Sequence, residues 1–238
     1  MHPPRRLAIV HLSGARGLDE VAAVAPNPRG SFHPLQSFPM PRPPSAFRGI
    51  TIAVDATSPA LERRLRALAR GLGATPKHVG DGERVLYHAA AVFASNFLDV
   101  VVGEGVQLLR RLGWSEEEAT RALLPLVDGA VDNIRSRGVV GALTGPIRRG
   151  DAETVARHLA ALKRPSGASE PLRRRRRHLP INGEEHLQNR EETFNLYRML
   201  GLVALRIARE AGLDPAAAER TRRALTRNVA ATRRRSGG

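Results

Sequence analysis

A long apolar stretch at residues 83–112 constrains the fold more than any other part of the sequence. Apolar or small residues fall on nearly every face of a helix drawn through it, which is typical of a helix buried on all sides. At about 1.5 Å per residue, such a helix would be about 40 Å long. We therefore expect one continuous central helix, the core of a helical domain.

A membrane span is the alternative explanation for this stretch. Polar residues interrupt it at His88, Asn96, Asp99 and Glu104, and nowhere do 18 consecutive apolar residues occur. A spanning helix needs about 20 predominantly apolar residues. No secretory signal is visible after the opening MHPPRR, and the chain contains no cysteine, which fits a reducing compartment. We expect a cytoplasmic protein without a membrane segment.

The few polar residues of the stretch include His88, Ser95 and Asn96, which are seven and eight positions apart. On a continuous helix this spacing is two turns, so the three side chains would share one face. Buried polar groups need hydrogen-bond partners. Two interpretations remain open: the side chains bond to nearby backbone groups inside a helical core, or they face a ligand.

The net charge of +15 would ordinarily favour nucleic acid as a partner. Only two of the 38 basic residues are lysine, however, and arginines are concentrated in runs at residues 173–177 and 233–235, where no apolar periodicity occurs. Aromatic residues make up 4% of the chain, too few for a base-stacking surface. We do not expect nucleic acid binding.

The first 80 residues have the pattern of an α/β domain, and the remainder of the chain has a helical pattern. Strands are predicted at residues 7–10 and 50–54, an extended segment at 30–38, a helix at 18–24, and a second helix capped by Ser58. Further on, Ser115 begins a capping box for a helix to about Arg135, kinked at Pro125. We expect an α/β part at 1–80, a helical core at 81–163, an arginine-rich linker at 164–185, C-terminal helices at 186–230 and a tail at 231–238.

The loop ALTGPIRRGD is the most specific local signal. Gly145 and Gly150 allow unusual backbone angles, and Arg148 and Arg149 carry forked donors suited to a carboxylate or a phosphate. A helix N-terminus comes next, which favours anions. The alternative is an ordinary turn in which Asp151 caps the helix itself.

Metal and serine-nucleophile chemistry are not expected. Four histidines, His11, His33, His88 and His158, have spacings that match no pair of ligands on one helix, and no cysteine is present. Ser13 lies in no G-x-S-x-G elbow.

Four motifs in a fixed order carry a resemblance: HLSGA at residues 11–15, GSFHPLQSF at 30–38, YHAAAVFASNFL at 87–98 and ALTGPIRRGD at 142–151. This order resembles a bacterial family that joins a Rossmann-like NAD(P)-binding domain to a helical domain of unknown function. The family is similar to pyrroline-carboxylate reductases and, more remotely, to 6-phosphogluconate dehydrogenases. The resemblance implies a partial α/β Rossmann-like domain followed by an all-α domain of the 6-phosphogluconate-dehydrogenase kind.

The resemblance also implies an activity, hydride transfer from NAD(P) to a small anionic substrate, with a homodimer formed through the helical domain. His88 would donate a proton or a hydrogen bond, and Asn96 would position the substrate. The residues implied for substrate binding are Ser95, Thr144, Gly145, Pro146 and Arg149. Those implied to face the nicotinamide are Ser13, Gly14, His33 and Pro34.

One departure from the family pattern concerns the cofactor. A dinucleotide-binding domain carries G-x-G-x-x-G after its first strand and an acidic residue about 20 positions on, and no such motif occurs before His11. The arginine run at 173–177 is a second departure. We expect the chain to lack the first half of the Rossmann-like domain, and a non-catalytic helical dimerisation or partner-binding module is the alternative function.

Overall fold

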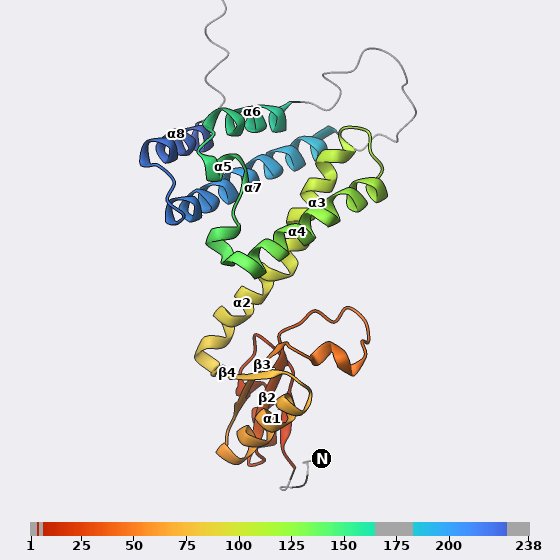
Figure 1. Cartoon of the computed structure of the whole chain (residues 1–238). Helices are drawn as coiled ribbons and strands as arrows, with labels where there is room; N and C mark the ends of the chain where they lie inside the picture. The colour runs from red at the N-terminus through yellow and green to blue at the C-terminus, as the bar shows by residue number, and fades with distance from the viewer. Residues whose placement is uncertain (1–3, 5–6, 165–182, 228–238) are drawn as a thin grey trace, which may run out of the picture. The chain divides into compact units, whose positions relative to one another are not determined.

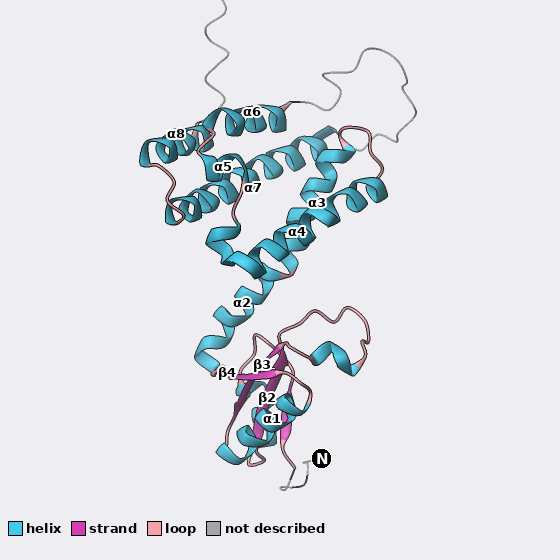
Figure 2. Ribbon diagram, viewed as in Figure 1, coloured by secondary structure: helices cyan, strands magenta, loops and turns pink. Residues whose placement is uncertain are grey.

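The computed structural model describes residues 4, 7–164 and 183–227. The chain forms two compact units, Met1–Gly103 and Glu104–Gly238, and helix α3, Asn96–Arg110, crosses the boundary. Among the described residues, all strands lie in the first unit, as Figure 2 shows. Most of the linker predicted at 164–185, including its arginine run, lies outside the described residues. Its last three positions, 183–185, belong to a helix.

Unit 1 is built on a four-stranded mixed sheet in the order β1-β2-β3-β4. The strands are β1 Ile9–His11, β2 Arg29–Pro34, β3 Thr51–Ala56 and β4 Thr75–His78. β1 and β2 are parallel, β2 and β3 are antiparallel, and β3 and β4 are parallel. The three predicted extended segments are thus confirmed, and β4 is a fourth strand that the sequence analysis did not include.

Helix α1, Pro59–Gly71, packs against β2, β3 and β4 (Figure 1). Ser58 caps it as expected, because its hydroxyl accepts a hydrogen bond from the Leu61 amide at 3.3 Å. Leu61 and Leu65 face the sheet and form a core with Phe32 and Ile52. Shorter 3-10 helices are η1 Leu18–Val24, η2 Pro44–Phe47 and η3 Asp81–Glu83.

The predicted single central helix is two helices, α2 Arg84–Ala94 and α3 Asn96–Arg110. Ser95 separates them with non-helical angles, φ −124° and ψ −79°, and its hydroxyl donates to the Ala91 carbonyl at 2.8 Å. Serine often bonds to the carbonyl four residues back and bends a helix. The expected shared face of His88, Ser95 and Asn96 is therefore interrupted.

The expectation that this stretch is buried on all sides was also wrong for the single chain. Arg84 is the buried residue of α2 and Val106 that of α3. The large apolar side chains that lie exposed along this stretch are Val85, Leu86, Phe93, Phe97, Leu98, Val100, Val101 and Leu112. By length and mean hydropathy, 1.6 over 18 residues, Asp81–Arg110 could cross a membrane, and none of that window is buried.

Unit 2 consists of helices, whose bounds are α4 Glu116–Ala142, α5 Gly145–Arg149, α6 Ala152–Lys163, α7 Gly183–Glu210 and α8 Pro215–Thr226. The Ser115 capping box is confirmed by hydrogen bonds in both directions with Glu118, at 3.2 and 2.8 Å. α4 continues past Arg135 and is interrupted at Gly138, where φ is +68°. Part of the expected loop at 142–151 is also helical, because α5 occupies Gly145–Arg149.

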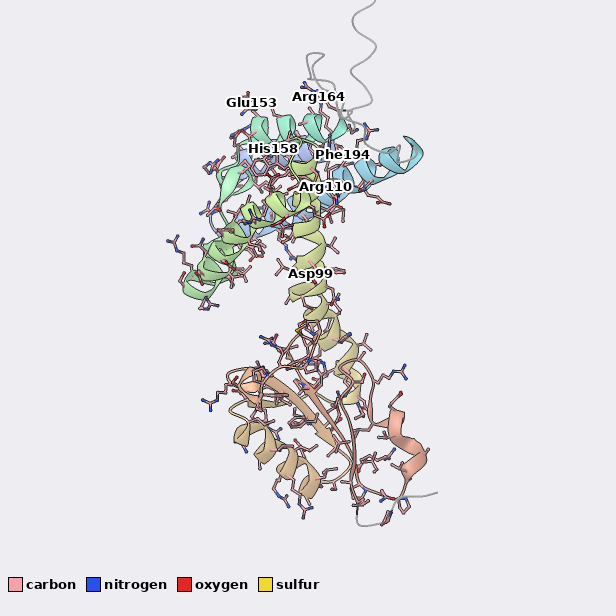
Figure 3. All side chains as sticks on the ribbon, turned by 90° about the vertical axis from the view of Figure 1, so that its right-hand side faces the viewer. Asp99, Arg110, Glu153, His158, Arg164 and Phe194 are labelled. Carbon is pink, nitrogen blue, oxygen red and sulfur yellow. The ribbon has the colours of Figure 1, made fainter. Side chains whose placement is uncertain are left out.

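The core of unit 2 lies between α6, α7 and α8, and it includes Val155, Leu159, Phe194, Leu205 and Leu225. Figure 3 labels Phe194 on α7 and His158 on α6. The predicted Asp151 cap of α6 is confirmed, because its carboxylate accepts from the Thr154 amide at 2.9 Å.

Candidate functional site

Two histidines lie at the same edge of the sheet in unit 1. His11 is the last residue of β1 and pairs with Ser31 on the parallel strand β2. His33 lies two residues beyond Ser31 on β2. In α/β sheets, ligands bind outside the carboxyl ends of the strands. The two parallel strands therefore place both imidazoles where a site is expected.

The loop after β1 fixes the tautomer of His11. The Ser13 amide donates to His11 Nδ1 at 3.2 Å, and the Ser13 hydroxyl accepts from the Arg16 amide at 3.1 Å. Because Nδ1 accepts a hydrogen bond, the neutral imidazole carries its proton on Nε2. That Nε2 is buried and has no hydrogen-bond partner among the described residues.

Helix α2 brings further side chains to this edge. His33 Nδ1 is 2.9 Å from the Tyr87 hydroxyl, and the ring centroids of His33 and His88 are 6.3 Å apart. Gly14 allows this close approach: a Cβ built on it would lie 2.7 Å from His33 Nε2 and 2.9 Å from His88 Nδ1. The loop after β1, the end of β2 and the start of α2 thus converge.

Arg84, the first residue of α2, is completely buried beside this cluster. None of its three guanidinium nitrogens has a hydrogen-bond partner among the described residues. The nearest carboxylate is Asp81, with Oδ1 3.6 Å from Arg84 Nε. That carboxylate already accepts a hydrogen bond from the Leu18 amide at 3.0 Å.

The electrostatics of the cluster follow from burial and from Arg84. Burial lowers the pKa of His11, and the positive charge of Arg84 lowers it further. Burial also lowers the pKa of His33, followed by the effects of His88 and Arg84. Burial raises the pKa of Tyr87. His11 and His33 are therefore neutral near pH 7, and Tyr87 keeps its proton.

This arrangement supplies hydrogen-bond donors and one proton-transfer pair. His11 Nε2–H and the guanidinium of Arg84 can donate to an acceptor, and the His33–Tyr87 contact can pass a proton between Nδ1 and the hydroxyl. We name His11, His33, Arg84, Tyr87 and His88 the histidine cluster.

Ser95 and Asn96, which were predicted to share a helix face with His88, lie at the break between α2 and α3. Ser95 donates to the Ala91 carbonyl and contacts Asn96 Oδ1 at 3.1 Å. For Ser95 the structure thus favours the interpretation in which the side chain bonds to the helix backbone. Asn96 is the first residue of α3.

The predicted substrate loop lies in unit 2. Thr144 precedes α5, Gly145 has φ +82° and Pro146 is the second residue of that helix. Arg148 donates to the Ala211 carbonyl at 2.8 Å, which gives it a structural role, whereas Arg149 is exposed. Asp151 bonds to the N-terminus of α6, as the capped-turn interpretation expected.

The described residues do not fit the pyrophosphate of a dinucleotide. Gly14 and Gly17 follow β1, but the Asp81 carboxylate fills the space beside Gly17, since a Cβ there would lie 2.6 Å from it. The same carboxylate accepts a hydrogen bond from the Leu18 amide. This backbone N–H is therefore not available to a phosphate. Within the described ranges, no group of three His, Cys, Asp or Glu could hold a metal ion.

Sequence reasoning missed Arg84 as a site residue, and it gave His11 and Tyr87 no role of their own, although both lie in the motifs that carried the resemblance. The sequence contained a signal for Arg84. After Glu83, it is the one charged residue before the apolar run VLYHAAAV. Charged residues are almost never fully buried unless they are paired. Spacing along a helix could not show that Arg84 lies against two strand ends.

Comparison with known protein families assigns the chain to one of them. Residues 50–173, just over half of the chain, match the family described as a domain of unknown function, DUF2520. The chain belongs to this family. The assignment confirms the resemblance noted from the four motifs, and no curated protein matches the chain.

Solved structures with a similar fold include two with TM-scores above 0.5. A candidate NADP oxidoreductase from Bacteroides fragilis has a TM-score of 0.60 at 23% identity, over 83% of this chain and 64% of that one. Protein TM1727 from Thermotoga maritima has 0.64 at 22% identity, over 85% and 69%. A pyrroline-5-carboxylate reductase from Streptococcus pyogenes has 0.44 at 12% identity, over 87% and 67%.

The likenesses to the Bacteroides fragilis and Thermotoga maritima structures confirm the predicted fold class. The four-stranded mixed sheet followed by helices matches part of a Rossmann-like domain and the helical domain of an NADP oxidoreductase-like protein. The chain spans 64% of the length of the Bacteroides fragilis protein.

Proposed function

We propose that this chain is part of an NAD(P)-dependent oxidoreductase-like protein that transfers hydride to a small anionic substrate. The observation that carries the proposal is the histidine cluster at the carboxyl ends of β1 and β2. The neutral imidazoles of His11 and His33 and the protonated Tyr87 are groups that can move a proton near pH 7. NAD(P) would supply the hydride when bound.

In this proposal His88 donates a proton or a hydrogen bond to the substrate. Its Nδ1 is buried without a hydrogen-bond partner among the described residues, so it is available to a ligand. Within unit 1, Ser13, Gly14, His33 and Pro34 face the nicotinamide, and Asn96 contacts the substrate. Because no pyrophosphate site is present among the described residues, we expect weak binding through the nicotinamide end.

Thermal unfolding of the purified chain tests this proposal. NADPH at 100 times its dissociation constant should stabilise the chain by roughly 2.7 kcal/mol. The control ligand is 2′-phospho-ADP-ribose, which keeps the phosphates and lacks the nicotinamide. A larger shift with NADPH supports the proposal, whereas equal shifts or none contradict it. In a turnover assay, unchanged kcat and KM in His88→Ala would exclude the role given to His88.

A second candidate is a non-catalytic dimerisation or partner-binding module, favoured by the exposed apolar side chains of α2 and α3. Phe93 is 71% exposed and Phe97 46%, and their rings meet edge to face at 5.0 Å. Exposed apolar patches mark interaction sites. We propose that a second copy of the chain covers this surface, which is compatible with either function.

Sedimentation of the detergent-free chain tests the dimer. We expect a dimer that Phe93→Glu dissociates, whereas Met40→Glu, at a residue 69% exposed outside these helices, should leave it intact. A monomeric wild-type chain would contradict the dimer, and a chain soluble only with detergent would favour a membrane-associated helix.

A further inference from the structure

The guanidinium of Arg84 has more donors than the described residues satisfy. Its five N–H groups lie on three nitrogens that are fully buried and make no hydrogen bond there. The nearest carboxylate, on Asp81, is 3.6 Å away and is already hydrogen-bonded to the Leu18 amide. A buried charge is costly unless it is paired and hydrogen-bonded.

A second donor belongs to the same cluster. His11 Nε2 carries the proton, because Nδ1 accepts from the Ser13 amide, and it makes no well-aligned hydrogen bond among the described residues, although an interaction with the Gly17 backbone raises the pKa of His11. The charge of Arg84 acts on His11, His33 and Tyr87, so the guanidinium lies close to all three. A ligand that satisfies these groups must be rich in acceptors and negatively charged.

A ligand can reach the guanidinium only if neighbouring side chains move. Arg84 is fully buried, whereas His11, His33, Tyr87 and His88 are only partly buried and are the groups that would have to give way. Carboxylates and phosphates accept two parallel hydrogen bonds from an arginine fork. Both are therefore suitable in chemistry, and a neutral ligand would leave the charge of Arg84 unpaired.

We propose that Arg84, with His11 Nε2–H as a second donor, binds the carboxylate or phosphate group of the substrate in unit 1. The inference deepens the proposed function, because it rests on that function for the identity of the anion as substrate. It assigns the main anion contact to Arg84, whereas the sequence pattern had pointed to Arg149 in unit 2.

Thermal unfolding in matched salts tests the proposal with the full chain and without cofactor. Sodium phosphate and sodium acetate are compared with sodium chloride at equal ionic strength. At 100 times the dissociation constant, the bound anion should raise the midpoint of unit 1 by roughly 10 °C. A shift with phosphate or with acetate identifies which anion class binds, and no shift with either overturns the proposal.

Arg84→Met separates binding from a purely structural role. Replacing a buried unpaired charge by an apolar side chain is often neutral or stabilising, so this variant should melt at or above the wild-type midpoint in chloride and show no response to the anion. Arg70→Met, at an exposed position of α1, is the matched control and should respond like the wild type. A full anion response in Arg84→Met overturns the proposal.

Arg84→Lys covers the case in which the methionine variant does not fold. It keeps the charge and loses the fork, so its anion dissociation constant should rise at least tenfold, and an unchanged constant overturns the proposal. A shift with phosphate or acetate but no nicotinamide-specific shift would retain the anion site and reject hydride transfer. A nicotinamide-specific shift without a shift in phosphate or acetate would retain hydride transfer and reject the anion site.

Discussion

Gly14→Ala is expected to disrupt the histidine cluster. The new Cβ would lie 2.7 Å from His33 Nε2, 2.8 Å from His33 Cε1 and 2.9 Å from His88 Nδ1. These are ring atoms and cannot bend away. His33 would have to rotate, which breaks its 2.9 Å contact with the Tyr87 hydroxyl.

The magnitude combines two costs. Overpacking a well-packed site typically costs about 1–3 kcal/mol, and the lost hydrogen bond adds about 1 kcal/mol. We therefore expect a destabilisation of about 2–4 kcal/mol. For a domain of about 100 residues, each kcal/mol lowers the midpoint by about 4–8 °C.

Thermal unfolding followed by circular dichroism measures the effect. Gly71→Ala is the matched control, since no atom lies within 4 Å of the new methyl group at the end of α1. It should be neutral or stabilise by up to about 1 kcal/mol. If Gly14→Ala melts like Gly71→Ala, the close approach of the loop to the two imidazoles is refuted.

Two further predictions concern pH and the core of unit 2. The pKa values of His11 and His33 are lowered in the folded chain, so the unfolded chain binds protons first and the free energy of unfolding should fall as the pH drops below about 6.5. Chemical denaturation between pH 7.5 and 5.5 measures this, and a more stable unit 1 at pH 5.5 would contradict it. Leu159→Ala should destabilise unit 2 by about 2–5 kcal/mol, because Leu159 is 2% exposed in its core. Leu126→Ala, at a side chain 71% exposed, should change the free energy by less than about 0.5 kcal/mol in the same urea titration.

Local features of the fold were predictable where neighbours in sequence decide them. The caps at Ser58, Ser115 and Asp151 each depend on a hydroxyl or carboxylate three residues before an amide, and all three form. The strands were predictable from short apolar runs bounded by turn residues.

The central stretch shows where such reasoning fails. Its apolar pattern predicted one buried helix, but periodicity cannot show that the Ser95 hydroxyl bonds to the Ala91 carbonyl. It also cannot distinguish burial within a chain from exposure on its surface, as the exposed ring of Phe93 demonstrates.

The candidate site was only partly predictable for the same reason. His88 and His33 were named from motifs, and the structure places their rings together. Arg84 was not, because its burial and its proximity to His11 and His33 arise only in the folded chain. Tertiary contacts of this kind leave no periodic trace in the sequence.

Nitrogen-detected NMR of the imidazoles tests the histidine cluster most directly, because it reports the tautomer and the pKa of each ring. His11 should carry its neutral proton on Nε2, and both His11 and His33 should titrate below 6.5. A proton on Nδ1 of His11, together with titration of both rings at or above 6.5, would mean that these side chains do not gather around Arg84.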